Sequence, residues 1–216
     1  MEKRELEVLE IGNMPVILSG IAAAVLAIIG LAGIIPEIAV AASAIAIGAS
    51  LVLVGIALGV ERRHILAETV SNHVGPRLFT TGIGMEIIAG ITSVVLGILA
   101  LLHIHANVLL ASDAIVLGLT LLYLCGVDAR MNKFRFDNPQ HKVLRESLAG
   151  IIDAQFIAGL GAVTLGILAL VRIAPLTLIQ VAFLTIGVIL AIKGTTLAAR
   201  LVQEYRETPA AATPGK

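Results

Sequence analysis

The chain has 216 residues, enough for one or two soluble domains, but its composition excludes that class of protein. Hydrophobic residues make up 58% of it, charged residues only 14%, and the mean hydropathy is +1.00. A soluble domain is about 45–50% apolar. The formal net charge is zero, so nothing indicates a nucleic-acid partner. The composition predicts an integral membrane protein whose main partner is the lipid bilayer.

Six segments are long and apolar enough to cross a membrane, which takes about 20 mostly apolar residues. They are residues 14–33, 37–60, 79–102, 107–127, 148–171 and 175–198. We therefore expect an all-α protein with six transmembrane helices. Between and around them we expect a short N-terminal segment at 1–13, loops at 61–78 and 128–147, and a tail at 199–216 whose end is disordered. The N-terminal segment lacks the features of a cleavable signal, so the first span is expected to remain as an anchor.

The short connections at 33–37, 103–107 and 172–175 predict three helical hairpins, at residues 14–60, 79–127 and 148–198. Pro36 and Pro175 suit the first turn of a helix, where the missing N–H costs nothing. Gly75-Pro76 and Asn138-Pro139 are expected to break the helices on the other side of the membrane.

Basic residues are distributed very unequally between the two sides. Of the fifteen Lys and Arg residues, thirteen precede the first span, follow the last or lie near the two longer loops, and Lys193 lies near the end of the last span. Only Arg172 lies in a short connection. Cytoplasmic segments are enriched in Lys and Arg, so this distribution predicts that both termini are cytoplasmic.

An internal repeat relates the three hairpins. Residues 17–34, 87–104 and 156–173 align without gaps, at offsets of 70 and 69 residues. The second and third segments are identical at 11 of 18 positions, and the first and second at 8 of 18. Each hairpin has an even number of spans, so all three insert in the same orientation. The repeats are therefore parallel, unlike the inverted repeats of many transporters.

Glycines recur at matching places in the repeats, often seven residues apart. Small residues let helices approach closely in lipid, so we expect these glycines to form helix contacts, with a lipid or ligand groove as the alternative. The expected packing residues are Gly20, Gly48, Gly55, Gly90, Gly97, Gly118, Gly159, Gly166, Gly187 and Gly194.

Four polar residues are predicted at membrane depth near the cytoplasmic side: Glu86, Asp153, Gln155 and Lys193. Glu86 shares a helix face with Gly90, and Gln155 is its equivalent in the third repeat. These four side chains form either a polar cluster, in which Glu86 exchanges protons, or separate sites. In the second case Lys193 reaches the interface and each carboxylate has its own hydrogen bond.

Titratable residues also lie on the outer side. His103 and His105 flank the second short connection, Glu37 follows the first, and Asp113 is expected near water without an obvious partner. Two histidines do not complete a zinc site, and Glu37 is expected to be distant, so no metal is predicted. Histidine gains a proton as the pH falls toward 6, which would make this side acid-responsive.

Motifs for catalysis or for cofactors were not found. The sequence contains no phosphate loop, nucleophile motif, zinc-protease motif or pair of histidines placed for haem, so no catalytic residue and no cofactor is predicted. Cys125 is the one cysteine and lies within a predicted span, so an intrachain disulfide is impossible.

The repeat motif resembles a known family. It comprises Ser19-Gly20, the sequence Leu-Gly-Ile-Leu-Ala-Leu at 96–101 and 165–170, a turn with Pro36 or Pro175, and a second helix with Ile47-Gly48 and Gly55. This pattern is similar to the short-repeat membrane proteins typified by the acid-resistance protein HdeD. The resemblance covers about residues 14–200. It departs from the pattern at Ala106-Asn107, where proline is expected, and at Cys125, which replaces a glycine.

The resemblance implies a stress-associated, non-enzymatic protein of a prokaryotic plasma membrane, with no catalytic residues to transfer. Two other functions stay open. One is a small channel or proton-coupled transporter that uses Glu86 and Asp153. The other is an accessory subunit of a larger membrane complex, or a homo-oligomer, whose glycines contact the partner.

Overall fold

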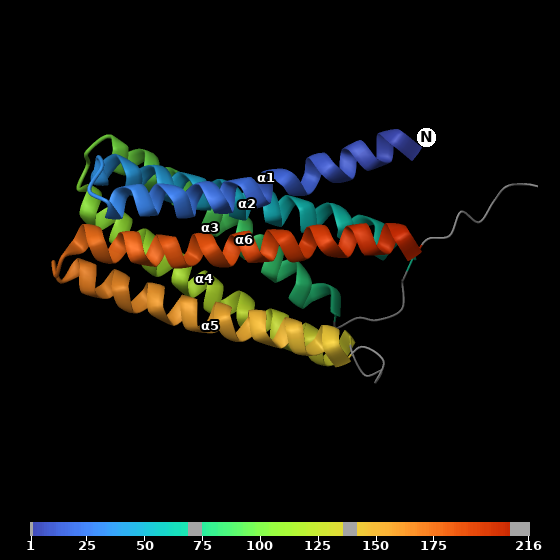
Figure 1. Cartoon of the computed structure of the whole chain (residues 1–216). Coiled ribbons are helices and arrows are strands. Elements are labelled where there is room, and N and C mark those ends of the chain that lie inside the picture. Colours follow the sequence, from blue (N-terminus) through green and yellow to red (C-terminus); the bar gives the residue numbers. More distant parts are fainter. Residues whose placement is uncertain (1, 69–74, 136–141, 208–216) are drawn as a thin grey trace, which may run out of the picture.

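The computed structural model describes the backbone of residues 2–68, 75–135 and 142–207 and the side chains of 17–56, 84–129 and 150–195. Across the described backbone there are six helices and no strand (Figure 1). They are α1 (Glu2–Leu31), α2 (Pro36–Glu68), α3 (Gly75–Leu101), α4 (Ala106–Arg135), α5 (Lys142–Leu170) and α6 (Pro175–Glu207). The three short turns lie together at one end of the bundle, which we call the turn end. The opposite end is the far end.

Five of the helices are long and apolar enough to cross a membrane. They are the segments Pro36–Ile56, Gly84–Leu101, Ala106–Ala129, Gly150–Leu170 and Pro175–Thr195. In α1 the described apolar segment is shorter, Ile17–Leu31, because residues 14–16 lie outside the described side chains. The prediction of an all-helical membrane protein is confirmed at this level.

Even-numbered helices form the centre of the bundle. In the described chain, α2, α4 and α6 contact one another, whereas α1, α3 and α5 contact only even-numbered helices. Burial follows the same pattern, since 56% of the apolar segment of α4 is buried but only 28% of that of α5. The outer helices expose large apolar side chains such as Ile88 and Ile157, as lipid-facing helices do.

The three hairpins close into a ring. Besides its partner within the hairpin, α2 packs against α3, α4 against α5, and α6 against α1. The last contact brings the first and last helices of the chain side by side (Figure 1). Each outer helix therefore lies in a groove between two inner helices.

The turns of the three hairpins share one geometry. The N–H of Ile34 donates to the carbonyl of Ile29, and the N–H of Gly33 to that of Gly30. The same pair of bonds recurs at positions 103–104 and 172–173. This pattern is the Schellman motif, which ends a helix with a left-handed residue. The left-handed residue of the motif is Gly33 (φ 80°) in the first turn, His103 (φ 60°) in the second and Arg172 (φ 67°) in the third. The residues two positions later, Ile35, His105 and Ala174, also have positive φ.

The helices extend beyond the predicted spans. The segments expected as loops at 61–78 and 128–147 are largely helical, because α2 continues to Glu68, α4 to Arg135, and α5 begins at Lys142. A helix satisfies its own backbone hydrogen bonds in water as in lipid, so it need not end at the membrane surface. Pro36 and Pro175 begin α2 and α6 as predicted, and Gly75-Pro76 begins α3. Asn138-Pro139 and the last nine residues lie outside the described residues.

Glycines bring the hairpins into backbone contact. A Cβ atom added to Gly90 would lie 2.6 Å from the carbonyl oxygen of Gly48, and one on Gly118 would lie 2.8 Å from that of Gly159. A Cβ on Gly20 would lie 2.8 Å from the backbone nitrogen of Ala191.

The other packing glycines lie in similar places. Gly97 and Gly166 face backbone carbonyls of α2 and α4, Gly187 faces α1, and Gly55 and Gly194 are buried. These glycines contact other helices of the same chain or are buried within it.

We expect Gly118→Ala to destabilise the bundle by about 1–3 kcal/mol, because the added methyl group separates α4 from α5. Gly126→Ala, on the same helix, is the control, because a Cβ there meets nothing within 4 Å. This change should be neutral or stabilise the protein by up to about 1 kcal/mol. Reversible unfolding of both variants in mixed detergent micelles measures the difference. Equal stabilities would contradict the assigned close contact.

Candidate functional site

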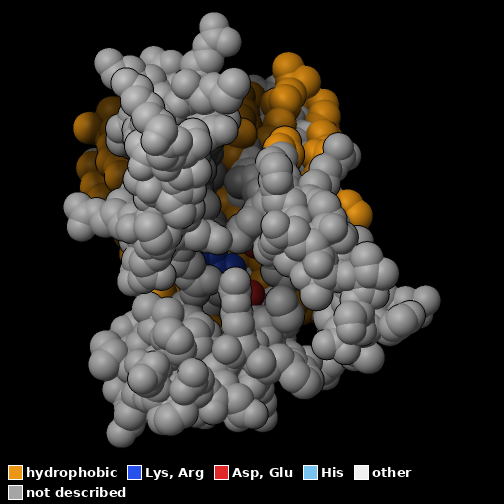
Figure 2. Space-filling view, turned by 90° about the vertical axis from the view of Figure 1, so that its right-hand side faces the viewer, with side chains coloured by type: hydrophobic (Ala, Val, Ile, Leu, Met, Phe, Trp, Pro, Cys, Tyr) orange, Lys and Arg blue, Asp and Glu red, His pale blue; other side chains and the backbone are white. Residues whose placement is uncertain are grey.

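Polar side chains of the described residues gather at three levels: the far end, a middle level at Ser93 and Asp113 in the turn-side third of α3 and α4, and the turn end. Figure 2 views the far end, where basic and acidic side chains are visible near the centre. Apolar side chains fill most of the core between these levels.

An ion pair joins two inner helices at the far end. Lys193 Nζ on α6 lies 3.5 Å from Asp128 Oδ2 on α4, with side chains 16% and 45% exposed. Asp128 was not among the predicted site residues, because the helix was expected to end before it. A signal for it exists, since Leu117, Leu121 and Leu124 are buried and residue 128 continues their helical face.

Glu86 on α3 is buried, with 3% of its surface exposed. It lies within electrostatic range of Lys193 and Asp128. Its Oε2 atom has no hydrogen-bond partner among the described residues. A carboxylate in an apolar bundle is costly unless it is paired or protonated, so Glu86 is a candidate for chemistry.

Of the four residues predicted to form a polar cluster, the structure brings only two together. Glu86 and Lys193 lie near each other, with Asp128 as the acidic companion in place of Asp153. Gln155 is fully buried in the contact between α4 and α5, where its Nε2 donates to the carbonyl of Leu121 over 3.0 Å. Asp153, two residues away, is exposed on the other side of α5.

Cys125 is also part of the far end. Its thiol lies 3.3 Å from the carbonyl oxygen of Ile152 on α5 and is in a donor position. It is a free cysteine within electrostatic range of Asp128, Asp153 and Lys193. Among the described residues, the far end thus brings Glu86, Asp128 and Lys193 of α3, α4 and α6 near one another, with a thiol beside them.

Asp113, in the middle level, corrects a prediction. It was expected near water without a partner, but its exposed fraction is 0%. Its Oδ2 atom lies 2.8 Å from the hydroxyl of Ser93 on α3, and that hydroxyl lies 3.0 Å from the carbonyl oxygen of Ala44 on α2. The error arose because depth along a helix does not determine which way a side chain faces.

The turn end carries a second ion pair. His103 Nε2 lies 3.8 Å from Glu37 Oε2, and both side chains are well exposed. The other ring nitrogen, Nδ1, lies 2.9 Å from the carbonyl oxygen of Leu101. Glu37 was expected to be distant from the histidines, and it is adjacent to His103 because α2 and the α3–α4 turn meet here.

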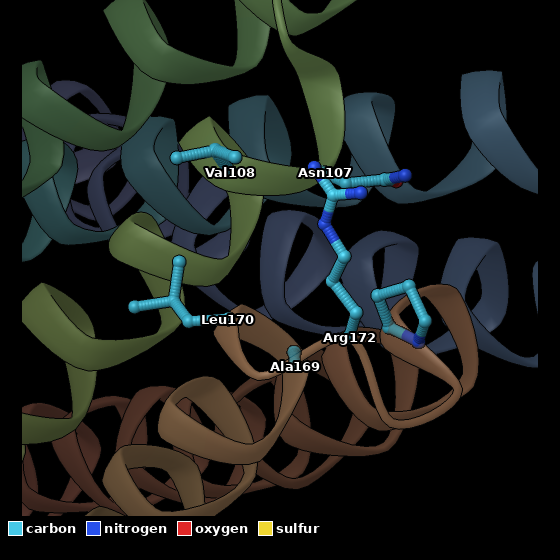
Figure 3. A pocket seen from close by; sticks show the side chains of 6 residues that line it. Asn107, Val108, Ala169, Leu170 and Arg172 are labelled. Atoms are coloured by element: carbon cyan, nitrogen blue, oxygen red, sulfur yellow. The ribbon is translucent and has the colours of Figure 1, made fainter.

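Two shallow depressions lie beside this pair. One of about 300 Å³ is lined by Glu37, His103, His105, Asn107 and Arg172, among others. The other, of about 240 Å³, lies between the start of α4 and the α5–α6 turn. Figure 3 shows Arg172 extending from that turn toward Asn107. Among the described residues, no group of three or more His, Cys, Asp or Glu is placed to hold a metal ion.

Across its described residues the protein is therefore all-helical, and five of its helices are long and apolar enough to cross a membrane. No family model, no curated protein and no solved structure matches the chain.

We expect the Lys193–Asp128 pair to contribute a coupling of about 0.5–1 kcal/mol, because Asp128 is partly exposed and solvent screens the pair. Unfolding of Asp128→Asn, Lys193→Gln and the double variant measures this coupling. The control cycle pairs Lys193→Gln with Glu37→Gln at the turn end, where the two effects should add. A far-end coupling no larger than that of the control would contradict the interaction.

Proposed function

We propose that the chain is a non-enzymatic, HdeD-like protein of a prokaryotic plasma membrane. It has six spans in three parallel hairpin repeats. The observation that carries this proposal is the agreement of the three turns, which have the same hydrogen bonds and left-handed residues at offsets of 70 and 69 residues. The cyclic packing of α2 on α3, α4 on α5 and α6 on α1 is what three equivalent hairpins would produce.

In the proposed orientation the turn end faces outward and both termini are cytoplasmic. This orientation is supported by the basic residues, since fourteen of fifteen belong to the far-end segments and Arg172 alone to a turn. The exposed Glu37–His103 pair would then meet the medium outside the cell. This pair joins α2 to the α3–α4 turn, so a change in the medium would reach a contact between two hairpins. We propose a role in acid or envelope stress on this basis.

A deletion strain should survive acid shock less well than its parent, and a plasmid copy of the wild-type gene should restore survival. A copy carrying His103→Gln should restore less, because a glutamine side chain cannot form the ion pair with Glu37. His105→Gln is the matched control, since among the described residues Glu37 pairs with His103 and not with His105. Membrane levels of each variant are compared by immunoblot. Unchanged survival of the deletion strain would remove this role.

A second candidate is a small channel or a proton-coupled transporter. It is favoured by Glu86, a buried acid with an oxygen that has no hydrogen-bond partner among the described residues, close to the Lys193–Asp128 pair. Asp153, which was paired with Glu86 in this hypothesis, is exposed and lies outside that arrangement.

The transport hypothesis predicts proton flux in liposomes that contain the purified protein and a pH-sensitive dye. Glu86→Gln should abolish the flux because an amide cannot exchange the proton, whereas Asp153→Asn should leave it unchanged. Liposomes with correctly inserted wild-type protein and no flux above that of empty liposomes would exclude this function.

A further inference from the structure

The hydroxyl of Ser93 faces two acceptors at hydrogen-bond distance. Asp113 Oδ2 lies at 2.8 Å and the carbonyl oxygen of Ala44 at 3.0 Å. A serine hydroxyl has a single hydrogen, so it can donate to only one of them. Both contacts are hydrogen bonds if Asp113 carries a proton of its own. The order is then Asp113 O–H to Ser93, and Ser93 O–H to Ala44.

Charge at this place is not balanced by any described cation. Asp113 has no exposed surface, and its second oxygen, Oδ1, has no hydrogen-bond partner among the described residues. The two ion pairs of the described residues, Lys193–Asp128 and His103–Glu37, lie at the two ends of the bundle. An ionised carboxylate would thus have one hydrogen bond in apolar surroundings, whereas a neutral acid needs no counter-charge.

The titratable side chains on neighbouring elements lie at other depths. On the helices that pack against α4, the described ones are Glu37 of α2, Glu86 of α3, Asp153 of α5 and Lys193 of α6. The turns add His103, His105 and Arg172, and α4 itself adds Asp128, Cys125 and Tyr123. Asp128, the partner of Lys193, lies 15 residues along α4 from Asp113, or roughly 22 Å at 1.5 Å per residue. The side chain that hydrogen-bonds Asp113 is Ser93.

Packing alone does not require a polar pair here. At the positions 69 residues later, the third hairpin has Ala162 and Ala182, and both are buried. At the positions 70 residues earlier, the first hairpin has Ala23 and Ser43, and Ser43 bonds to the carbonyl of its own helix at Ala39. The bundle therefore accommodates alanine at both members of this pair.

We propose that Asp113, Ser93 and the Ala44 carbonyl form a buried proton-binding site that links α4, α3 and α2. This proposal goes beyond the function proposed above, since it holds whether or not the protein transports protons. Release of the proton would leave two oxygens competing for the Ser93 hydrogen. Ser93 lies three residues after Gly90 on α3, and Ala44 lies four residues before Gly48 on α2. The backbones of α2 and α3 are in contact at these two glycines. Occupancy of the site is therefore expected to act on the contact between α2 and α3.

Infrared spectroscopy of the purified full-length protein in detergent tests the proposal directly. A protonated carboxylic acid has a C=O stretching band that a carboxylate lacks. We expect Asp113→Asn to remove one such band at neutral pH, and Ser93→Ala to shift that band because the acid loses its acceptor. Asp128→Asn is the matched control and should leave the band in place. Spectra of wild type and Asp113→Asn that agree in this region would overturn the proposal.

Thermal unfolding against pH gives an independent test. The folded chain holds a proton that the unfolded chain releases, so the wild-type midpoint should fall as the pH rises. Asp113→Asn should reduce that fall, since the amide donates to Ser93 at every pH. The double variant Ser93→Ala/Asp113→Ala copies the third hairpin, and it should fold and show the same reduced dependence. A fall of unchanged size in both variants would contradict the site.

A metal cation is the competing occupant. The same measurements in NaCl and in choline chloride, at equal ionic strength, separate the two. The proton site predicts equal midpoints in both salts. A higher midpoint in NaCl for wild type, absent in Asp113→Asn, would overturn the proposal in favour of a sodium site.

Discussion

Close backbone contact between neighbouring hairpins is the constraint on which the rest of the bundle depends. Lipid is as apolar as the helix surfaces, so burying aliphatic side chains gives little drive for helix association in a membrane. Contact between backbones at Gly48 and Gly90, at Gly118 and Gly159, and at Gly20 and Ala191 supplies van der Waals attraction instead. Each contact joins an inner helix to the outer helix of the next hairpin, and three of them close the ring.

The same contacts determine where polar groups can be enclosed. Glu86 lies four residues before Gly90 and Ser93 three after it, so both share the side of α3 that meets α2. Gln155 lies four residues before Gly159 and has the corresponding place between α4 and α5. Where two helices are this close, a polar side chain reaches a backbone carbonyl of its neighbour. The amide of Gln155 and the hydroxyl of Ser93 both do so.

The spans, turns and packing positions were predictable because they follow from local patterns. Apolar length predicts the spans, and Pro36 and Pro175 predict where two helices begin. The direction of single polar side chains was less accessible. Asp113 was misjudged because its burial depends on the rotation of α4, which its neighbours determine. Asp128 was missed because α4 continues past the predicted end of the span. The left-handed conformation of His103 and Arg172 could be inferred only from their alignment with Gly33.

Ring closure has a consequence for how the chain is ordered. The first residue of α1 and the last of α6 both lie at the far end, where α2 and α4 also end and α3 and α5 begin (Figure 1). A linker between Glu207 and Glu2 would therefore join α6 to α1 at the end where the chain already joins α2 to α3 and α4 to α5. New termini could then be placed between α2 and α3 or between α4 and α5. Circular permutants that begin at α3 or at α5 would keep every helix contact described above. Which hairpin comes first in the chain is thus not determined by the helix contacts, because each hairpin packs on the next around the ring.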